Sequence, residues 1–202
     1  ELFSKSQNMG IRASRGEYVL CLNNDVVLRE DFIEKLIHKA RFNNEKIGIF
    51  TGKVLSQDGN KIDSCGQLLS RSRKPIERGY GRHEIQLYQK CEAVFGACGA
   101  ASLFKREMLD EISINEEYFD EDFAIFFEDL DLNWRANNFG WKALYIPDAV
   151  CFHRRGATTI LKIQVPLLKN FILPNIPHKL QAYFIRNRYL AVIKNDSIKK
   201  IL

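Results

Sequence analysis

A short apolar run that ends in a polar, acidic turn is the feature that most constrains how this chain folds. The run Tyr18–Leu22 is followed directly by Asn-Asn-Asp, whose acid is Asp25. Such a run with a polar boundary is typical of a buried strand. Beyond it, Asp31 and Glu34 have capping-box spacing and precede apolar residues at helical intervals. The sequence therefore predicts a strand, a polar turn and an amphipathic helix.

The same alternation continues along the chain. Apolar runs at 47–50 and 141–146 predict two further strands, and residues 105–112 and 128–136 have helical spacing. Residues 93–104 resemble a strand crowded with small side chains, which let a ligand approach the backbone closely. We expect a long mobile loop over the polar, basic stretch between these elements, residues 70 to 90. Strands that alternate with helices predict an α/β domain.

Composition agrees with one soluble domain in a reducing compartment. A chain of 202 residues that is 46% apolar buries one substantial core and excludes intrinsic disorder. Its five cysteines are odd in number and lack zinc-ligand spacing, so we expect buried free thiols. No apolar run reaches the roughly 18 to 20 residues that a membrane-spanning helix needs. We therefore expect a cytoplasmic protein.

The net charge of +5 hides a separation of charge along the chain. Residues 1–150 hold 20 Lys and Arg against 24 Asp and Glu, whereas residues 151–202 hold 10 against Asp196 alone. This predicts an acidic body suited to a metal ion and a basic tail that meets nucleic acid, anionic lipid or a phosphorylated ligand. Within the tail, residues 180–193 have helical spacing with one apolar side. This helix either lies peripherally on a membrane surface or packs on the body with its basic face solvated.

Three groups of polar residues are candidates for chemistry. Asp25 stands at a strand end, where it is either part of a turn or a ligand for Mg²⁺ or Mn²⁺. Glu128, Asp129 and Asp131 gather at a predicted helix start, where they either cap the helix or supply a general base. His153 is either a structural histidine or an extra metal ligand. The two arginines after it either meet a pyrophosphate or face solvent.

Five segments with these residues follow one another in a recognisable order. They are Gln7–Ala13, Gly16–Asp25, Gly96–Ala101, Phe119–Glu121, and Glu128–Arg135 with Gly140–Lys142, Pro147 and His153. Together they resemble the family 2 glycosyltransferases, especially the rhamnosyltransferase-like branch. The resemblance runs over residues 7–155, and Arg186-Asn187-Arg188 resembles a later segment of the family.

This resemblance implies a GT-A fold, in which helices flank a mixed sheet, and a metal-dependent enzyme of polysaccharide or glycan assembly. Such enzymes transfer a sugar from a nucleotide-diphosphate sugar to a hydroxyl of a glycan or lipid-linked acceptor, with inversion at the anomeric carbon. The resemblance makes Asp129 the catalytic base, supported by Glu128, and makes Asp25 and His153 ligands of Mg²⁺ or Mn²⁺. The expected donor-binding residues are Asn8, Arg12, Asn23, Asn24 and Asp25, and the expected acceptor-side residues are Gly99 and Trp134.

The resemblance also implies an N-terminally truncated catalytic domain that lacks the family's first strand, helix and strand, which would leave a sheet edge exposed. We expect this partial domain over residues 1–158 and a basic, partly helical tail over residues 159–202. One alternative is a non-catalytic GT-A-like remnant that binds glycan or a protein partner. Nucleic-acid binding through the tail is a weaker alternative, because the body is acidic and carries no nucleic-acid motif.

Overall fold

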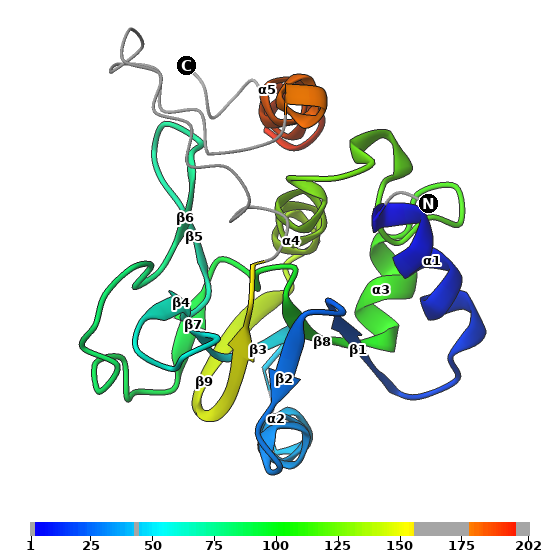
Figure 1. Cartoon of the computed structure of the whole chain (residues 1–202). Helices are drawn as coiled ribbons and strands as arrows, with labels where there is room; N and C mark the ends of the chain where they lie inside the picture. Colours follow the sequence, from blue (N-terminus) through cyan, green and yellow to red (C-terminus); the bar gives the residue numbers. More distant parts are fainter. Residues whose placement is uncertain (1–2, 43–44, 156–177, 197–202) are drawn as a thin grey trace, which may run out of the picture.

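The computed structural model describes residues 3–42, 45–155 and 178–196. A seven-stranded mixed sheet forms the centre of this described part (Figure 1). Its main path has the order β1-β8-β3-β9-β2, with β4 paired to β3 and β7 paired to β9. These strands are β1 (Tyr18–Leu22), β2 (Val26–Leu28), β3 (Ile47–Ser56), β4 (Ile62–Ser64), β7 (Glu92–Val94), β8 (Ala101–Lys105) and β9 (Lys142–His153). Among the described residues only β3 and β9 pair in parallel, and β1 lies at one edge.

Helices cover both faces of the sheet. They are α1 (Phe3–Ala13), α2 (Phe32–Arg41), α3 (Arg106–Ile112), α4 (Glu128–Asn138) and α5 (His178–Asn195), with a 3-10 turn η1 (Glu121–Phe123) before α4. A separate hairpin, β5 (Gln67–Leu69) with β6 (Pro75–Glu77), lies beside the sheet. None of the described helices is both long enough and apolar enough to cross a membrane.

Alternation along the strands builds two core layers. In β3, Ile49 joins the cluster under α1, α3 and α4, whereas its neighbour Phe50 joins the cluster under α2. Helix α5 packs on the outer side of α4 through a third cluster that includes Trp134 and Ala191 (Figure 1). The expected α/β fold with a mixed sheet is thus confirmed.

Most of the elements predicted from the sequence form at the predicted residues, including β1, α2, α3 and α4. Helix α1 was not predicted from the sequence. Its buried residues, Ser4, Asn8 and Ile11, have helical spacing, but two of the three are polar. An apolar periodicity therefore does not reveal this helix.

The expectation that a strand ends at Ile146 is wrong, because β9 continues through Pro147 to His153. The register between β3 and β9 shifts after Gly52, which forms a bulge. A Cβ atom at Gly52 would lie 2.2 Å from the carbonyl oxygen of Ala149. Because Gly52 has no side chain, β3 and β9 can stay paired on both sides of Pro147.

Four local expectations also need correction. Asp31 makes no side-chain cap bond to α2 and instead pairs with Arg29 and Lys35. The stretch 70–90 contains strand β6, and the Lys53 ammonium donates to the carbonyls of residues 85 and 87 in it at 2.9 and 3.2 Å. Four of the cysteines are buried and free as expected, but Cys91 is exposed. The segment 93–104 forms two strands, because residues 95–100 leave the sheet between β7 and β8.

Candidate active site

One part of the candidate site lies where β2 begins and β9 ends. Asp25 precedes β2, and its Oδ1 lies 3.2 Å from Nε2 of His153, the last residue of β9. The antiparallel register pairs Val26 with His153, which explains why residues so far apart in the chain meet here. The structure therefore brings together two of the residues predicted to face a metal ion.

Asp63 of β4, which was not predicted from the sequence, fixes this pair. Its Oδ2 lies 2.8 Å from Nδ1 of His153, and its Oδ1 accepts a hydrogen bond from Arg155. The Asp63 side chain is 5% exposed, so these bonds satisfy a carboxylate that would otherwise be buried alone. A carboxylate on the far nitrogen of a histidine is the usual outer partner of a metal-ligating imidazole.

These residues fit a metal ion that is shared with a phosphate ligand. Two adjacent ligands at about 2.1 Å from Mg²⁺ stand about 3 Å apart, close to the 3.2 Å between Asp25 and His153. Nearby, the buried Oδ1 of Asn23 has no hydrogen-bond partner among the described residues. No group of three or more His, Cys, Asp or Glu side chains in the described ranges is arranged as a metal cage. Mg²⁺ in nucleotide sites is commonly held by one or two protein side chains plus phosphate oxygens.

Asp129, the predicted base, lies in the first turn of α4 and faces the segment before β8. Its Oδ2 accepts from the backbone N–H of Gly99 at 2.9 Å, and its Oδ1 accepts from the N–H of Leu130 at 2.7 Å. Burial raises the pKa of Asp129, and these N–H donors oppose that rise. The structure thus places Gly99, an expected acceptor-side residue, directly against the carboxylate.

Glu128 has a different environment from its neighbour. It is 7% exposed, and its Oε2 has no hydrogen-bond partner within the described part of the chain. Burial, and secondarily the charge of Asp129, raises the pKa of Glu128 to about 8. The two carboxyl groups therefore differ in their hydrogen bonds: backbone N–H groups donate to both oxygens of Asp129, whereas none of the described residues donates to Oε2 of Glu128.

The backbone of residues 96–100 joins the two halves of the site. The N–H of Gly99 bonds to Asp129, and the carbonyl of Ala100 accepts from the N–H of Asn23 at 2.9 Å. Asn133 of α4 holds the start of this segment, since its amide donates to the Ala97 carbonyl at 2.8 Å and accepts from the Ala97 N–H at 3.3 Å. Small residues in this segment let α4 approach its backbone.

A polar network from the β5–β6 hairpin lies behind Asp129. The Gln67 amide donates to Glu77 at 3.1 Å and, at 3.5 Å, to Asp129, while its oxygen accepts from Asn133. Burial, with the nearby Asp129, raises the pKa of Glu77 to about 7. These residues carried no sequence signal, because a glutamine and a glutamate in a polar stretch look like solvent-exposed residues.

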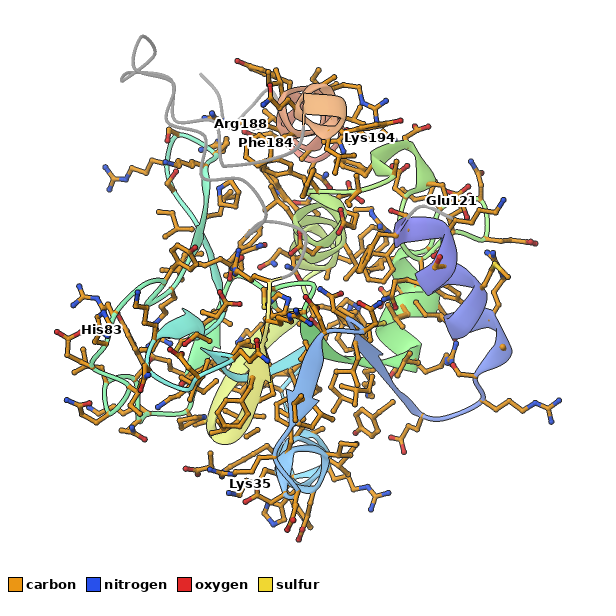
Figure 2. All side chains as sticks on the ribbon, in the orientation of Figure 1. Lys35, His83, Glu121, Phe184, Arg188 and Lys194 are labelled. Carbon is orange, nitrogen blue, oxygen red and sulfur yellow. The ribbon has the colours of Figure 1, made fainter. Side chains whose placement is uncertain are left out.

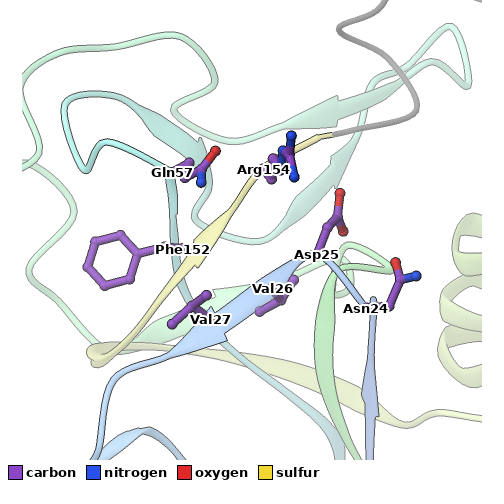
Figure 3. A pocket seen from close by; sticks show the side chains of 7 residues that line it. All are labelled: Asn24, Asp25, Val26, Val27, Gln57, Phe152 and Arg154. Atoms are coloured by element: carbon purple, nitrogen blue, oxygen red, sulfur yellow. The ribbon is translucent and has the colours of Figure 1, made fainter.

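A pocket of about 500 Å³ opens beside Asp25 (Figure 3). Its lining combines apolar and polar side chains from β2 and the turn before it, from the end of β9 and the residue after it, and from the turn after β3, namely Asn24, Asp25, Val26, Val27, Gln57, Phe152 and Arg154. Asn24, one of the expected donor-binding residues, therefore shares this pocket with Asp25.

Three other predicted site residues lie apart from this centre. Asn8 is 0% exposed, and its amide binds the backbone of residues 118–119 and the Glu121 carboxylate. Arg12 is exposed on α1 and donates to the carbonyl of Glu116. Trp134 is 5% exposed and packs in the core cluster between α4 and α5. These contacts link structural elements, and the expected donor-side and acceptor-side roles of the three residues stay predictions.

Comparison with known proteins assigns a family to this arrangement. The family model described as glycosyltransferase like family 2 matches residues 2–166. A poly-beta-1,6-N-acetyl-D-glucosamine synthase from Staphylococcus epidermidis is 27% identical over 149 residues, covering 72% of this chain and 32% of that protein. An N-acetylglucosaminyltransferase from Bradyrhizobium diazoefficiens is 25% identical over 154 residues, covering 72% of this chain and 29% of that protein. The chain thus spans less than a third of the length of these two relatives.

A solved structure supports the fold independently. The crystal structure of GalNAc-T7 with UDP, GalNAc and Mn²⁺ matches with a TM-score of 0.59 and 14% identity, covering 89% of this chain and 35% of that one. At this identity the match concerns the fold alone, which is the GT-A fold.

Proposed function

The chain belongs to glycosyltransferase-like family 2, and we propose that it transfers a sugar from a nucleotide-diphosphate sugar to an acceptor hydroxyl, with inversion at the anomeric carbon. The observation that carries the proposal is the bond between the Asp129 carboxylate and the Gly99 N–H, one residue from the link to the Asp25 turn. A base and a phosphate-binding side are then held by one rigid backbone segment. Such fixed geometry is what a transfer between two bound substrates requires.

In this mechanism, the Asp25 end of the sheet binds the donor's diphosphate. Asp25 and His153 would hold Mg²⁺ or Mn²⁺, which stabilises the negative charge that builds on a departing diphosphate. Asp63 keeps the His153 ring oriented from behind. The pocket beside Asp25 gives room for part of a bound substrate.

Asp129 acts on the acceptor. Its ionised carboxylate accepts the proton of the attacking hydroxyl as that oxygen bonds to the anomeric carbon, and general-base assistance of this kind contributes roughly 10²- to 10⁴-fold. Inversion follows because the hydroxyl and the leaving diphosphate lie on opposite sides of the sugar carbon. Glu128 stays behind Asp129 as a buried, neutral acid at mildly acidic to neutral pH.

The names of the relatives guide the choice of substrates. Two of them are an N-acetylglucosaminyltransferase and a poly-N-acetylglucosamine synthase, so an N-acetylglucosamine donor is the first to test. A rhamnose donor is the second, because the sequence resembles the rhamnosyltransferase-like branch. The acceptor is a glycan or a lipid-linked glycan.

We place this activity at the cytoplasmic face of a membrane, with peripheral contact through α5. Ile185, Tyr189 and Ile193 recur every four residues on this helix and are 45%, 64% and 77% exposed. The part of the chain from residue 151 onward is strongly basic. An exposed apolar stripe in a basic segment suits the surface of an anionic membrane.

Donor binding tests the proposal without requiring the true acceptor. Mn²⁺ and a nucleoside diphosphate together should raise the midpoint of thermal unfolding, because both bind the folded state. Asp25→Ala should lose this shift, and Asp129→Asn should keep it, since Asp129 lies on the acceptor side. An equal shift in the parent and in Asp25→Ala would contradict the assignment of the phosphate-binding side.

A further inference from the structure

The backbone directly before the catalytic acids is strained. Ala124, Phe126 and Phe127 have φ angles of 59°, 69° and 66°, in the left-handed region that residues other than glycine rarely adopt. A residue in this conformation is strained and persists only where its surroundings enforce it. Phe127 immediately precedes Glu128 and Asp129, so whatever enforces this loop also sets where α4 begins.

One side chain of α5 holds the strained loop. Asn187 is 0% exposed, and its amide nitrogen lies 2.6, 2.9 and 2.9 Å from the carbonyl oxygens of Phe123, Ile125 and Phe126. Its own oxygen accepts from Nε of Arg186 at 2.9 Å. Three carbonyls around one end and a donor at the other fix the orientation of the amide.

The rest of α5 holds the same region on both sides of Asn187. Phe184 packs against the rings of Phe126 and Phe127, with centroids 5.9 and 4.9 Å apart. Lys194 pairs with Asp120 and Asp122 before the loop. Asn195 donates to Oδ1 of Asp131 in the first turn of α4 at 2.7 Å. Figure 2 shows Phe184 on the side of α5 that faces α4. Lys194 points toward the segment that precedes α4.

We propose that Asn187 is a positioning residue for the transfer reaction. It fixes the loop of residues 123–127 and thereby holds the Asp129 carboxylate on the Gly99 N–H. Asn187 is fully buried and acts through this loop. The inference rests on the proposed function of Asp129, because its kinetic consequence exists only if Asp129 is the base.

The test compares variants of Asn187 in the whole chain. Asn187→Ala removes the donor, and the nearly isosteric Asn187→Asp replaces it with oxygens that face three carbonyls. Both should lower kcat at least 10-fold, since a misplacement of about 1 Å in a reacting group costs roughly 100-fold. The KM for the donor should stay within twofold, because Asp25 and His153 lie on other elements. Asn60→Ala, in the exposed turn after β3, is the matched control and should behave as the parent.

A milder variant covers the case in which Asn187 variants do not fold. Arg186 is exposed, yet it orients the Asn187 amide and also donates to the carbonyl of Asp122. Arg186→Ala should therefore lower kcat in the same direction but less, again with the KM for the donor unchanged. If kcat stays within twofold of the parent in every Asn187 and Arg186 variant that folds, the proposal is overturned. Parallel losses in kcat and donor binding would also overturn it.

Hydrogen exchange separates this inference from the proposed function. In the Asn187 and Arg186 variants, the amides of Gly99 and Leu130, both bonded to Asp129, should exchange faster, while the amides of β3 keep their protection. Unchanged exchange at Gly99 and Leu130 would overturn the positioning role even if transfer fell. If the variants show this faster exchange but the parent transfers no sugar, the proposed function fails while the positioning of Asp129 by Asn187 stands.

Discussion

Hydrogen bonds distinguish the two buried, neighbouring carboxyl groups at the start of α4. The oxygens of Asp129 accept from two backbone N–H groups, which stabilise its charged form. Oε2 of Glu128 has no such partner among the described residues, and burial raises the pKa of Glu128 to about 8. The N–H donors favour the charged form of Asp129, which is the form that a base requires.

This difference predicts a pH dependence of stability. Below the ordinary pKa of 4.5, Glu128 is protonated in both the folded and the unfolded chain. As the pH rises toward about 8, the unfolded chain loses this proton first, so the free energy of unfolding of the parent should fall. Glu128→Gln cannot ionise and should lose less stability across the same window, measured by urea unfolding at several pH values. The exposed Glu30→Gln serves as control and should follow the parent; equal pH slopes in parent and Glu128→Gln would refute the burial argument.

Single residues also show which parts of the candidate site can be predicted from the sequence and which cannot. Asp25, His153 and Asp129 were predicted, and the structure places the first two together and the third across the 96–100 segment. Asp63 was not predicted, because its partner His153 is 90 residues away and only the sheet register brings them together. Trp134 had the expected chemistry for a sugar contact, but the packing of α5 buries it in the core.

At the level of elements, the contact between α4 and the segment before β8 decides the geometry of the site. Asn133 binds both the N–H and the carbonyl of Ala97, as a neighbouring strand would. Gly96 makes this approach possible, because a Cβ there would lie 2.1 Å from Cγ of Asn133. The run of small residues recognised in the sequence therefore serves helix packing at one end and the base at the other.

Substitution of this glycine should loosen the contact. Gly96→Ala forces a methyl group into the Asn133 amide, and overpacking of this kind destabilises by about 1 to 3 kcal/mol. Gly10→Ala is the matched control, since a Cβ there meets nothing within 4 Å and alanine in a helix stabilises by about 0.5 to 1 kcal/mol. Urea unfolding of both variants measures the effects. A Gly96→Ala protein as stable as the parent would show that α4 can shift away from this segment.

Periodic elements were predictable, and elements set by long-range contacts were not. Strand β1 and helix α2 carry enough local pattern to be read from sequence. Strand β6 and helix α1 do not, because β6 has only three residues and the polar Asn8 occupies a buried position of α1. The burial of Asn8 is offset by hydrogen bonds to distant segments, which no local window of sequence contains.

At the scale of the whole molecule, α5 belongs to the basic part of the chain, so its position shows where that part meets the acidic body. The helix packs on α4, as the docked alternative required, and Arg73 of the β5–β6 turn pairs with Asp196 just beyond it. Its opposite side still presents Ile185, Tyr189 and Ile193. Packing on the body and contact with a membrane are therefore compatible. The expected domain division at residue 158 falls outside the described residues and stays a prediction.

The membrane proposal predicts binding to lipid vesicles. The parent should co-sediment with vesicles that contain an anionic lipid and much less with neutral vesicles, because both the basic charge and the apolar stripe contribute. The double variant Tyr189→Ser with Ile193→Ser should bind more weakly at an unchanged thermal midpoint, since both side chains are exposed. Equal binding by parent and double variant would mean that α5 is not the contact.

The central claim is that Asp129 is the base of a sugar transfer, and turnover of Asp129→Asn tests it most directly. The measurement is the metal-dependent release of nucleoside diphosphate from a panel of nucleotide sugars with an acceptor, compared with the parent at equal folded fraction. We predict a loss of roughly 10²- to 10⁴-fold with donor binding retained. Turnover of Asp129→Asn at the parent rate would contradict the account.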